Sequence, residues 1–171
     1  MRTDDFKYIY RVGLGTDIHA LAKGNRLMLG GVFVEHHSGP IAHSDGDVII
    51  HAVIDAILGA TGMGDIGEVF PDDDPEFEDM DSGVMLSNVT RRIEEDRWEV
   101  VNLDVTVKVQ APRLKEYKPQ MKRSLASLLG MDFAAVNVKA KTNEGLDAVG
   151  HEEAVEALAV VLLRQRQRRT L

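Results

Sequence analysis

Residues 101–110 alternate strictly between apolar and polar side chains, which leaves few structures open to this part of the chain. Valine or leucine occupies every odd position, and a polar residue occupies every even one. Because successive side chains of a strand point to opposite faces of a sheet, this period predicts a half-buried β-strand. Residues 136–141 repeat the pattern, so a second strand of the same kind is expected.

The rest of the chain alternates between strand and helix patterns, and residues 1–171 are expected to form one domain. Its core is expected over 8–167, with flexible ends at 1–7 and 168–171. The expected elements are strands over 8–15, 27–29, 32–34, 101–110 and 136–141, and helices over 47–60, 82–96, 114–129 (or from Pro119) and 151–166. This order predicts an α/β (α+β) fold, in which one mixed β-sheet has its helices packed on one face.

Composition limits the function. The chain carries 28 acidic and 20 basic residues, a net charge of −8, which argues against a general nucleic-acid binder. Cysteine is absent, so neither a disulfide nor a thiolate metal site can form. The polar first residues lead into no long apolar run, so no signal peptide or membrane span is expected. We therefore expect a cytoplasmic protein that binds neither nucleic acid nor a membrane.

Asp17 and His19 lie two residues apart at the end of the first expected strand. Side chains at i and i+2 of a strand point to the same face, so these two can bind one ion together. His51, from the first expected helix, would be a third ligand. Two histidine nitrogens and one carboxylate oxygen suit zinc, and three protein ligands leave the open position that is typical of a catalytic ion.

A polar stripe runs along the same expected helix, because Asp47, His51 and Asp55 recur every four residues in an otherwise apolar segment. Such a stripe needs partners, which a metal ion or the groups around it would supply. The turn-rich residues 64–75 follow, and loops of this length in compact domains are often functional. No phosphate-binding Gly-x-x-x-x-Gly-Lys-Ser/Thr sequence is present, which argues against a kinase or nucleoside triphosphatase.

Several short motifs are spread in order from about residue 11 to residue 163. They are Gly13-Leu14-Gly15-Thr16-Asp17-Ile18-His19, Ala42-His43-Ser44-Asp45-Gly46-Asp47, His51 with Asp55, Gly64-Asp65-Ile66-Gly67, Phe70-Pro71-Asp72, Gln110-Ala111-Pro112, and Asn137-Val138-Lys139-Ala140 leading to Thr142 and Glu144. As an ordered set they resemble the 2-C-methyl-D-erythritol 2,4-cyclodiphosphate synthase family of the non-mevalonate isoprenoid pathway.

The resemblance implies a homotrimer of α/β subunits with active sites between neighbouring subunits. It implies conversion of 4-diphosphocytidyl-2-C-methyl-D-erythritol 2-phosphate into 2-C-methyl-D-erythritol 2,4-cyclodiphosphate and CMP, a phosphorus–oxygen lyase reaction in isoprenoid precursor biosynthesis. Asp17, His19 and His51 would hold zinc or another divalent ion. Glu144 would bind magnesium or manganese together with the substrate phosphates.

The resemblance also implies roles in binding and catalysis. His43 and Thr142 would stabilise the transition state. Asp65 and Gly67 would bind the ribose, the backbone of residues 109–115 would line the cytosine pocket, and the loop at 70–74 would meet the methylerythritol phosphate. The implied substrate-binding residues are Asp17, Ile18, His19, His43, Ser44, Asp65, Ile66, Gly67, Phe70, Pro71, Asp72, Asp73, Asp74, Val109, Gln110, Ala111, Pro112, Arg113, Leu114, Lys115, Lys141, Thr142, Asn143, Glu144, Ala148 and His151.

The chain departs from the family pattern at residues 147–153. Ala148 stands where a bulky residue is common, and His151 stands where arginine is common. This stretch lines the central channel of the family's trimer, and a neutral histidine lacks the bidentate fork with which arginine binds phosphate. The change argues against an isoprenoid diphosphate in the channel. Lys141, where threonine is common, would restore some positive charge near the substrate phosphates.

Two other functions remain open. In the cyclising reaction the 2-phosphate oxygen of the substrate attacks the β-phosphorus, so the protein needs no serine or cysteine nucleophile. A metal-dependent hydrolase of nucleoside diphosphate compounds would use water instead and release a linear phosphate. A non-catalytic trimer would bind metal and cytidine diphosphate without turnover.

Overall fold

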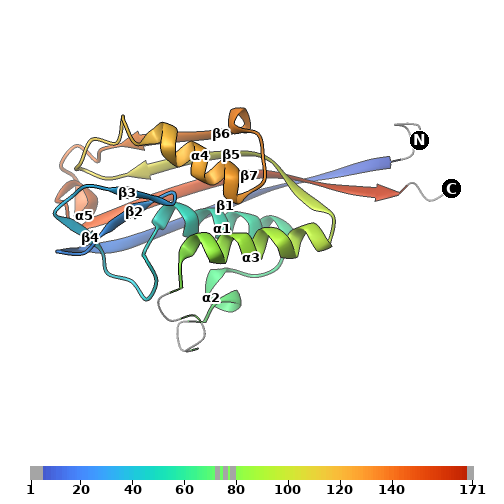
Figure 1. Cartoon of the computed structure of the whole chain (residues 1–171), viewed down its shortest axis with the longest axis horizontal. Coiled ribbons are helices and arrows are strands. Elements are labelled where there is room, and N and C mark those ends of the chain that lie inside the picture. The colour runs from blue at the N-terminus through green and yellow to red at the C-terminus, as the bar shows by residue number, and fades with distance from the viewer. Residues whose placement is uncertain (1–5, 72–73, 75–76, 78–79, 169–171) are drawn as a thin grey trace.

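The computed structural model describes residues 6–71, 74, 77 and 80–168, and it contains a five-stranded mixed sheet in the order β4-β1-β7-β5-β6 (Figure 1). The strands are β1 (Phe6–Lys23), β2 (Leu27–Leu29), β3 (Val32–Val34), β4 (Ser38–Pro40), β5 (Trp98–Lys108), β6 (Val136–Lys141) and β7 (Ala154–Arg168). The helices are α1 (Val48–Thr61), α2 (Ile66–Val69), α3 (Ser82–Glu95), α4 (Lys118–Leu128) and α5 (Asp147–Gly150), with a short 3₁₀ helix at Phe133–Ala135. The single domain and the mixed sheet of the sequence prediction are thus confirmed.

The prediction of a helix over residues 151–166 is wrong, because residues 154–168 form strand β7 in the middle of the sheet. β7 pairs antiparallel with β1 on one side and with β5 on the other. Its alternate residues from Val155 to Leu163 are fully buried, while Leu158 and Leu162 on the other face are apolar too. A central strand that is apolar on both faces lacks the alternation of polar and apolar residues, so its sequence can be mistaken for that of a helix. The arginines near its end therefore belong to a strand, not to a helix terminus.

The helices α1, α3 and α4 lie on one face of the sheet, as expected (Figure 1). Helix α1 packs most closely, against β1 and β7. Small residues permit this approach: a Cβ atom built at Gly13 would lie 1.8 Å from the carbonyl oxygen of Ala56, and one at Gly15 would lie 2.0 Å from that of Ala52. Glycine at both positions therefore fixes how close β1 can come to the backbone of α1.

The start of α1 is held by Asp47, the residue before its first turn. The buried carboxylate of Asp47 accepts hydrogen bonds from the amides of Ile49 and Ile50 and also from those of Gly30 and Gly31. The cap thereby ties the helix to the turn between β2 and β3. Of the predicted polar stripe, Asp47 therefore has a structural role as a helix cap.

The uncovered face of the sheet is apolar along β1. Even-numbered residues of this strand point away from α1, and several are more than half exposed, including Tyr10, Val12, Leu14 and Ile18. Phe6 and Lys7 belong to β1 and Arg168 belongs to β7, while residues 1–5 and 169–171 lie outside the described part of the chain. None of the described helices is long and apolar enough to cross a membrane.

Candidate active site

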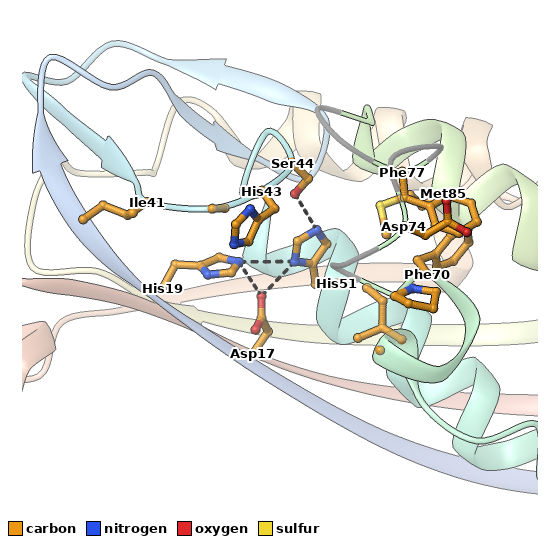
Figure 2. Close-up of a pocket in the computed structure, with 14 residues that line it drawn as sticks. Asp17, His19, Ile41, His43, Ser44, His51, Phe70, Asp74, Phe77 and Met85 are labelled. Atoms are coloured by element: carbon orange, nitrogen blue, oxygen red, sulfur yellow. Dashed lines mark hydrogen bonds and ion pairs between the residues drawn. The ribbon is translucent and has the colours of Figure 1, made fainter.

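Asp17, His19 and His51 meet where β1 passes the first turn of α1, as the sequence predicted (Figure 2). Oδ2 of Asp17 lies 3.1 Å from Nε2 of His19 and 3.1 Å from Nδ1 of His51. The two ring nitrogens are 3.3 Å apart. The alternation of β1 turns both of its ligands toward the helix, on the same face as Gly13 and Gly15.

The triangle of these three atoms has the size of one face of a tetrahedral zinc site. Ligands about 2.0–2.1 Å from a tetrahedral ion stand roughly 3.3 Å from one another. The observed sides of 3.1–3.3 Å match this spacing without movement of the backbone. Two imidazoles and one carboxylate also form a donor set that binds zinc, so these residues fit a divalent ion with one open position.

The electrostatics of the cluster favour a cation. Burial raises the pKa of Asp17, but the hydrogen bonds and charges of His19 and His51 outweigh burial and hold this pKa well below its ordinary value. Burial lowers the pKa of His51, but Asp17 and then the carboxylates of Asp47 and Asp45 outweigh it and raise this pKa. An ionised carboxylate thus lies beside the His51 ring, which can exchange its proton for a metal ion.

The cluster forms one wall of a cavity of about 540 Å³. The lining residues are Asp17, His19, Ile41, Ala42, His43, Ser44, His51, Ile66, Gly67, Phe70, Pro71, Asp74, Phe77 and Met85. Figure 2 shows the labelled side chains of His43 and His19, which both line this cavity. The cavity therefore brings together the predicted metal ligands, Gly67 from the predicted ribose contacts, and His43, Ser44 and Phe70 from the predicted contacts to the methylerythritol phosphate.

Asp55, the last residue of the predicted stripe, positions the loop that follows α1. Its Oδ1 accepts a hydrogen bond of 2.8 Å from the amide of Ile66. The next turn is closed by Asp65, which accepts a hydrogen bond of 2.9 Å from the amide of Glu68 and caps α2. The segment predicted to bind ribose is thus fixed to the helix that carries His51.

Other predicted residues lie away from the cavity. Among the described residues, several that the resemblance implies in ribose, cytosine, phosphate, second-metal or channel contacts do not line it: Asp65, Val109, Gln110, Ala111, Pro112, Arg113, Leu114, Lys115, Lys141, Thr142, Asn143, Glu144, Ala148 and His151. Asp65 caps α2 and Lys141 ends β6, while the others follow β5 or β6 or lie in α5 and directly after it. Thr142 donates a hydrogen bond of 2.6 Å to Oε1 of Glu144, whose backbone adopts a positive φ of 53°.

Two further predictions differ from what the structure places in the cavity. The side chain of Ile18 is 57% exposed on the opposite face of β1, because it alternates with Asp17 and His19. A substrate in this cavity could meet only its main chain. Asp72 and Asp73 lie outside the described residues, whereas Asp74 lines the cavity.

Sequence reasoning missed several residues of the site. Ile41, Ala42, Phe77 and Met85 give the cavity its apolar lining. Ser82, the first residue of α3, lies with its Oγ 2.9 Å from Nε2 of His51. Its position after Asp81, which caps this helix, identifies a helix start but gives no sign of a contact with a residue so far back in the chain.

Comparisons with known proteins point to one family. The model of the YgbB family matches residues 10–164. A protein of Bordetella avium named 2-C-methyl-D-erythritol 2,4-cyclodiphosphate synthase is 50% identical over 154 residues, which cover 90% of this chain and 95% of the relative.

Solved structures give the same relationship. A CDP complex of IspF from Plasmodium falciparum matches with a TM-score of 0.80 and 32% identity, over 92% of this chain and 97% of that one. The bifunctional IspDF from Campylobacter jejuni matches with a TM-score of 0.89 and 38% identity, over 93% of this chain but only 43% of the larger protein. The chain therefore belongs to the YgbB family, as a relative of proteins named 2-C-methyl-D-erythritol 2,4-cyclodiphosphate synthase.

Proposed function

We propose that this protein is a cyclodiphosphate synthase that converts 4-diphosphocytidyl-2-C-methyl-D-erythritol 2-phosphate into 2-C-methyl-D-erythritol 2,4-cyclodiphosphate and CMP. The observation that carries the proposal is the Asp17–His19–His51 triangle, sized for a tetrahedral ion and open to a cavity of about 540 Å³. The relative from Bordetella avium, which carries this name, shares half of its residues over nearly its whole length.

The chemistry needs positioning and charge neutralisation more than a protein nucleophile. The 2-phosphate oxygen of the substrate attacks the β-phosphorus while the bond to CMP breaks, so attacking and leaving oxygens must lie in line. A zinc ion held by Asp17, His19 and His51 would polarise a phosphoryl oxygen as a Lewis acid. His43 and Ser44 line the cavity beside this cluster, where they can orient the phosphate and donate to its oxygens.

The second ion and the cytosine pocket would be supplied by a neighbouring subunit. Thr142 and Glu144 lie in the loop after β6, apart from the cavity residues of their own chain. Glu144 would bind magnesium or manganese with the substrate phosphates, and residues 109–115 would enclose the cytosine. A homotrimer with sites between subunits accounts for both halves of the site.

The uncovered face of the sheet supports this assembly. Its exposed apolar side chains include Tyr8, Tyr10, Val12, Leu14, Ile18 and Val160. A contiguous apolar patch of this kind is typical of an interface between proteins.

The implied location in the cytoplasm remains a prediction from the sequence.

Phosphorus NMR of the protein with the cytidyl substrate, zinc and magnesium tests the proposal. Resonances of a cyclic diphosphate that appear together with CMP are the expected result. A linear phosphate would identify a hydrolase, and an unchanged substrate in the presence of bound zinc would identify a binding protein; either result would overturn the proposal.

The variant His51→Ala tests the metal assignment. It should lose zinc and lower turnover by at least about 100-fold, since the ion then keeps only two protein ligands. The control is His37→Ala, which alters an exposed histidine outside the cavity, in a separate group of possible ligands with His36 and Glu152, and should keep turnover and the zinc bound by Asp17, His19 and His51.

A further inference from the structure

We propose that Ser82 and Asp45 are positioning residues that hold the His51 ring through a chain of hydrogen bonds and fix which ring nitrogen carries the proton. The chain keeps the proton of Nε2 in place, so that Nδ1, which faces Asp17 and His19, is the nitrogen that exchanges its proton for the metal ion. This inference rests on the proposed function for its catalytic meaning, but its evidence is the geometry of the described residues.

The contacts run in one line from the metal cluster into the protein. Nδ1 of His51 faces Asp17, at 3.1 Å, while Nε2 on the far side of the ring lies 2.9 Å from Oγ of Ser82. The hydroxyl of Ser82 in turn donates a hydrogen bond to Oδ1 of Asp45. Oγ of Ser44 lies 3.2 Å from the same Nε2 and can share its proton.

Simple rules for donors and acceptors give the direction of each bond. A carboxylate can only accept, so the single hydroxyl proton of Ser82 points to Asp45. Ser82 can then only accept from the imidazole, which places the ring proton on Nε2. A neutral ring with its proton on Nε2 has its lone pair on Nδ1, the atom that faces the predicted ion.

Burial makes this chain effective. Ser82 is fully buried and the side chain of His51 is 10% exposed, so water cannot easily replace either partner. The carboxylate of Asp45 also accepts from the amide of Asp47, at 3.3 Å, which links it to the N-terminal end of α1. The loop before α1, the start of α3 and the metal ligand on α1 are thereby connected.

Partners of this kind strongly affect metal sites. A histidine ligand commonly donates its second ring N–H to a carboxylate or another acceptor, and removal of such a partner costs about 10–100-fold in metal affinity. Here a hydroxyl transmits the effect of the carboxylate. Ser82 and Asp45 can therefore affect metal affinity without touching the substrate.

The test compares Ser82→Ala with Ser87→Ala in the purified full chain. Ser87 is an exposed serine on the same helix, whose hydroxyl donates to the carbonyl of Gly83, so its loss controls for a serine-to-alanine change in α3. Zinc affinity is measured by competition with a chromophoric chelator. We expect zinc to bind Ser82→Ala about 10–100-fold more weakly, and Ser87→Ala and the wild type with equal affinity.

A second readout responds to the tautomer and not to fold stability. ¹⁵N shifts of the His51 ring in the zinc-bound wild type, assigned with His51→Asn, should show the proton on Nε2 and the metal ion on Nδ1. In Ser82→Ala and Asp45→Ala the shift of Nε2 should move, because its hydrogen bond is lost or weakened. This measurement on the wild type remains decisive even if a variant fails to fold.

A zinc affinity of folded Ser82→Ala within about twofold of the wild type, or zinc bound to Nε2 of His51 in the wild type, would overturn the inference. Neither measurement uses the cyclisation reaction. If the wild type binds zinc as described but produces no cyclic diphosphate, the proposed function fails while the positioning role is still decided by these two readouts.

Discussion

At the scale of single residues, the pKa values of Asp17 and His51 shift in opposite directions because the two side chains contact each other. Asp17 has a lowered pKa and His51 a raised one, and each shift is caused by hydrogen bonding and charge that outweigh burial. Without a metal ion the pair therefore favours an ionised carboxylate next to a protonated ring. With a metal ion, the same geometry is occupied by a cation in place of the proton.

The pair makes the stability of the metal-free protein depend on pH. Because the folded pKa of His51 is raised, its contribution is complete below the unfolded pKa of about 6.5 and is lost as the pH rises through the folded pKa. Because the folded pKa of Asp17 is lowered, its contribution is present above about 3.9 and is lost only as the pH falls through the folded pKa.

We therefore expect the urea midpoint of the metal-free protein to fall between about pH 6 and pH 9. The net charge of −8 gives a background trend of the same sign. His51→Asn retains that background but lacks the titrating ring, so its midpoint should fall less over this range. Equal slopes for the two proteins would contradict the assignment.

Asp47 offers a second prediction at this scale. Its carboxylate accepts from four backbone amides at 2.6–3.1 Å, and burial raises its pKa against the effect of these bonds. Asp47→Ala would leave buried donors unpaired and should lower the free energy of unfolding by about 2–4 kcal/mol.

Within the described part of the chain, the exposed cap Asp81 accepts from the amide of Val84, so Asp81→Ala is the matched control and should cost about 1 kcal/mol. Urea titrations of both variants give the comparison. Equal losses would show that the link to the turn between β2 and β3 contributes little.

At the scale of elements, close packing of β1 on α1 places the metal ligands of the two elements within reach of each other. Gly15→Ala would bring a methyl group to 2.0 Å from the carbonyl oxygen of Ala52 and force the elements apart. We expect a loss of about 3 kcal/mol in unfolding free energy and weaker zinc binding.

Gly59→Ala is the control within α1, since a Cβ atom there meets nothing within 4 Å. It should raise stability by about 0.5–1 kcal/mol, because alanine favours a helix more than glycine does. Calorimetry of both variants decides the point, and a neutral Gly15→Ala would show that the elements can separate freely.

Local patterns explain which elements could be predicted from the sequence. Strand β6 and the β2–β3 hairpin agree with the expected residues because each has clear periods or turns of its own. Strand β7 could not be recognised, since it is apolar on both faces and contains alanines that fit beneath α1. Its identity depends on neighbours far away in the sequence, which override local propensity.

The site residues, too, could be predicted only where a local pattern marks them. Asp17 and His19 could be paired from their spacing on a strand, and His51 from its place on a polar stripe. Ser82 could not, because its partner is 31 residues away and a serine at a helix start has many ordinary roles. The residues beyond β5 and β6 were predicted only from the resemblance to the family.

At the scale of the whole molecule, the uncovered face of the sheet should determine assembly. Leu14 is 64% exposed in the middle of the apolar patch. Leu14→Lys would place a charge in the proposed interface and should shift the protein from trimer to monomer in sedimentation equilibrium, with loss of turnover. Ser87→Lys, on the exposed side of α3, is the control and should remain a trimer. An active monomer in either protein would contradict sites shared between subunits.

The two faces of strand β1 have different roles. Asp17 and His19 face His51 on α1, while Leu14 and Ile18 point to the uncovered side of the sheet. Insertion of one residue after Gly15 would exchange the faces of everything that follows. Such an insertion would bury an isoleucine in place of the ligands and turn two ligands outward. During evolution this strand can therefore change its residues one at a time, but it can hardly change its length, whereas the surface loops are free to do so.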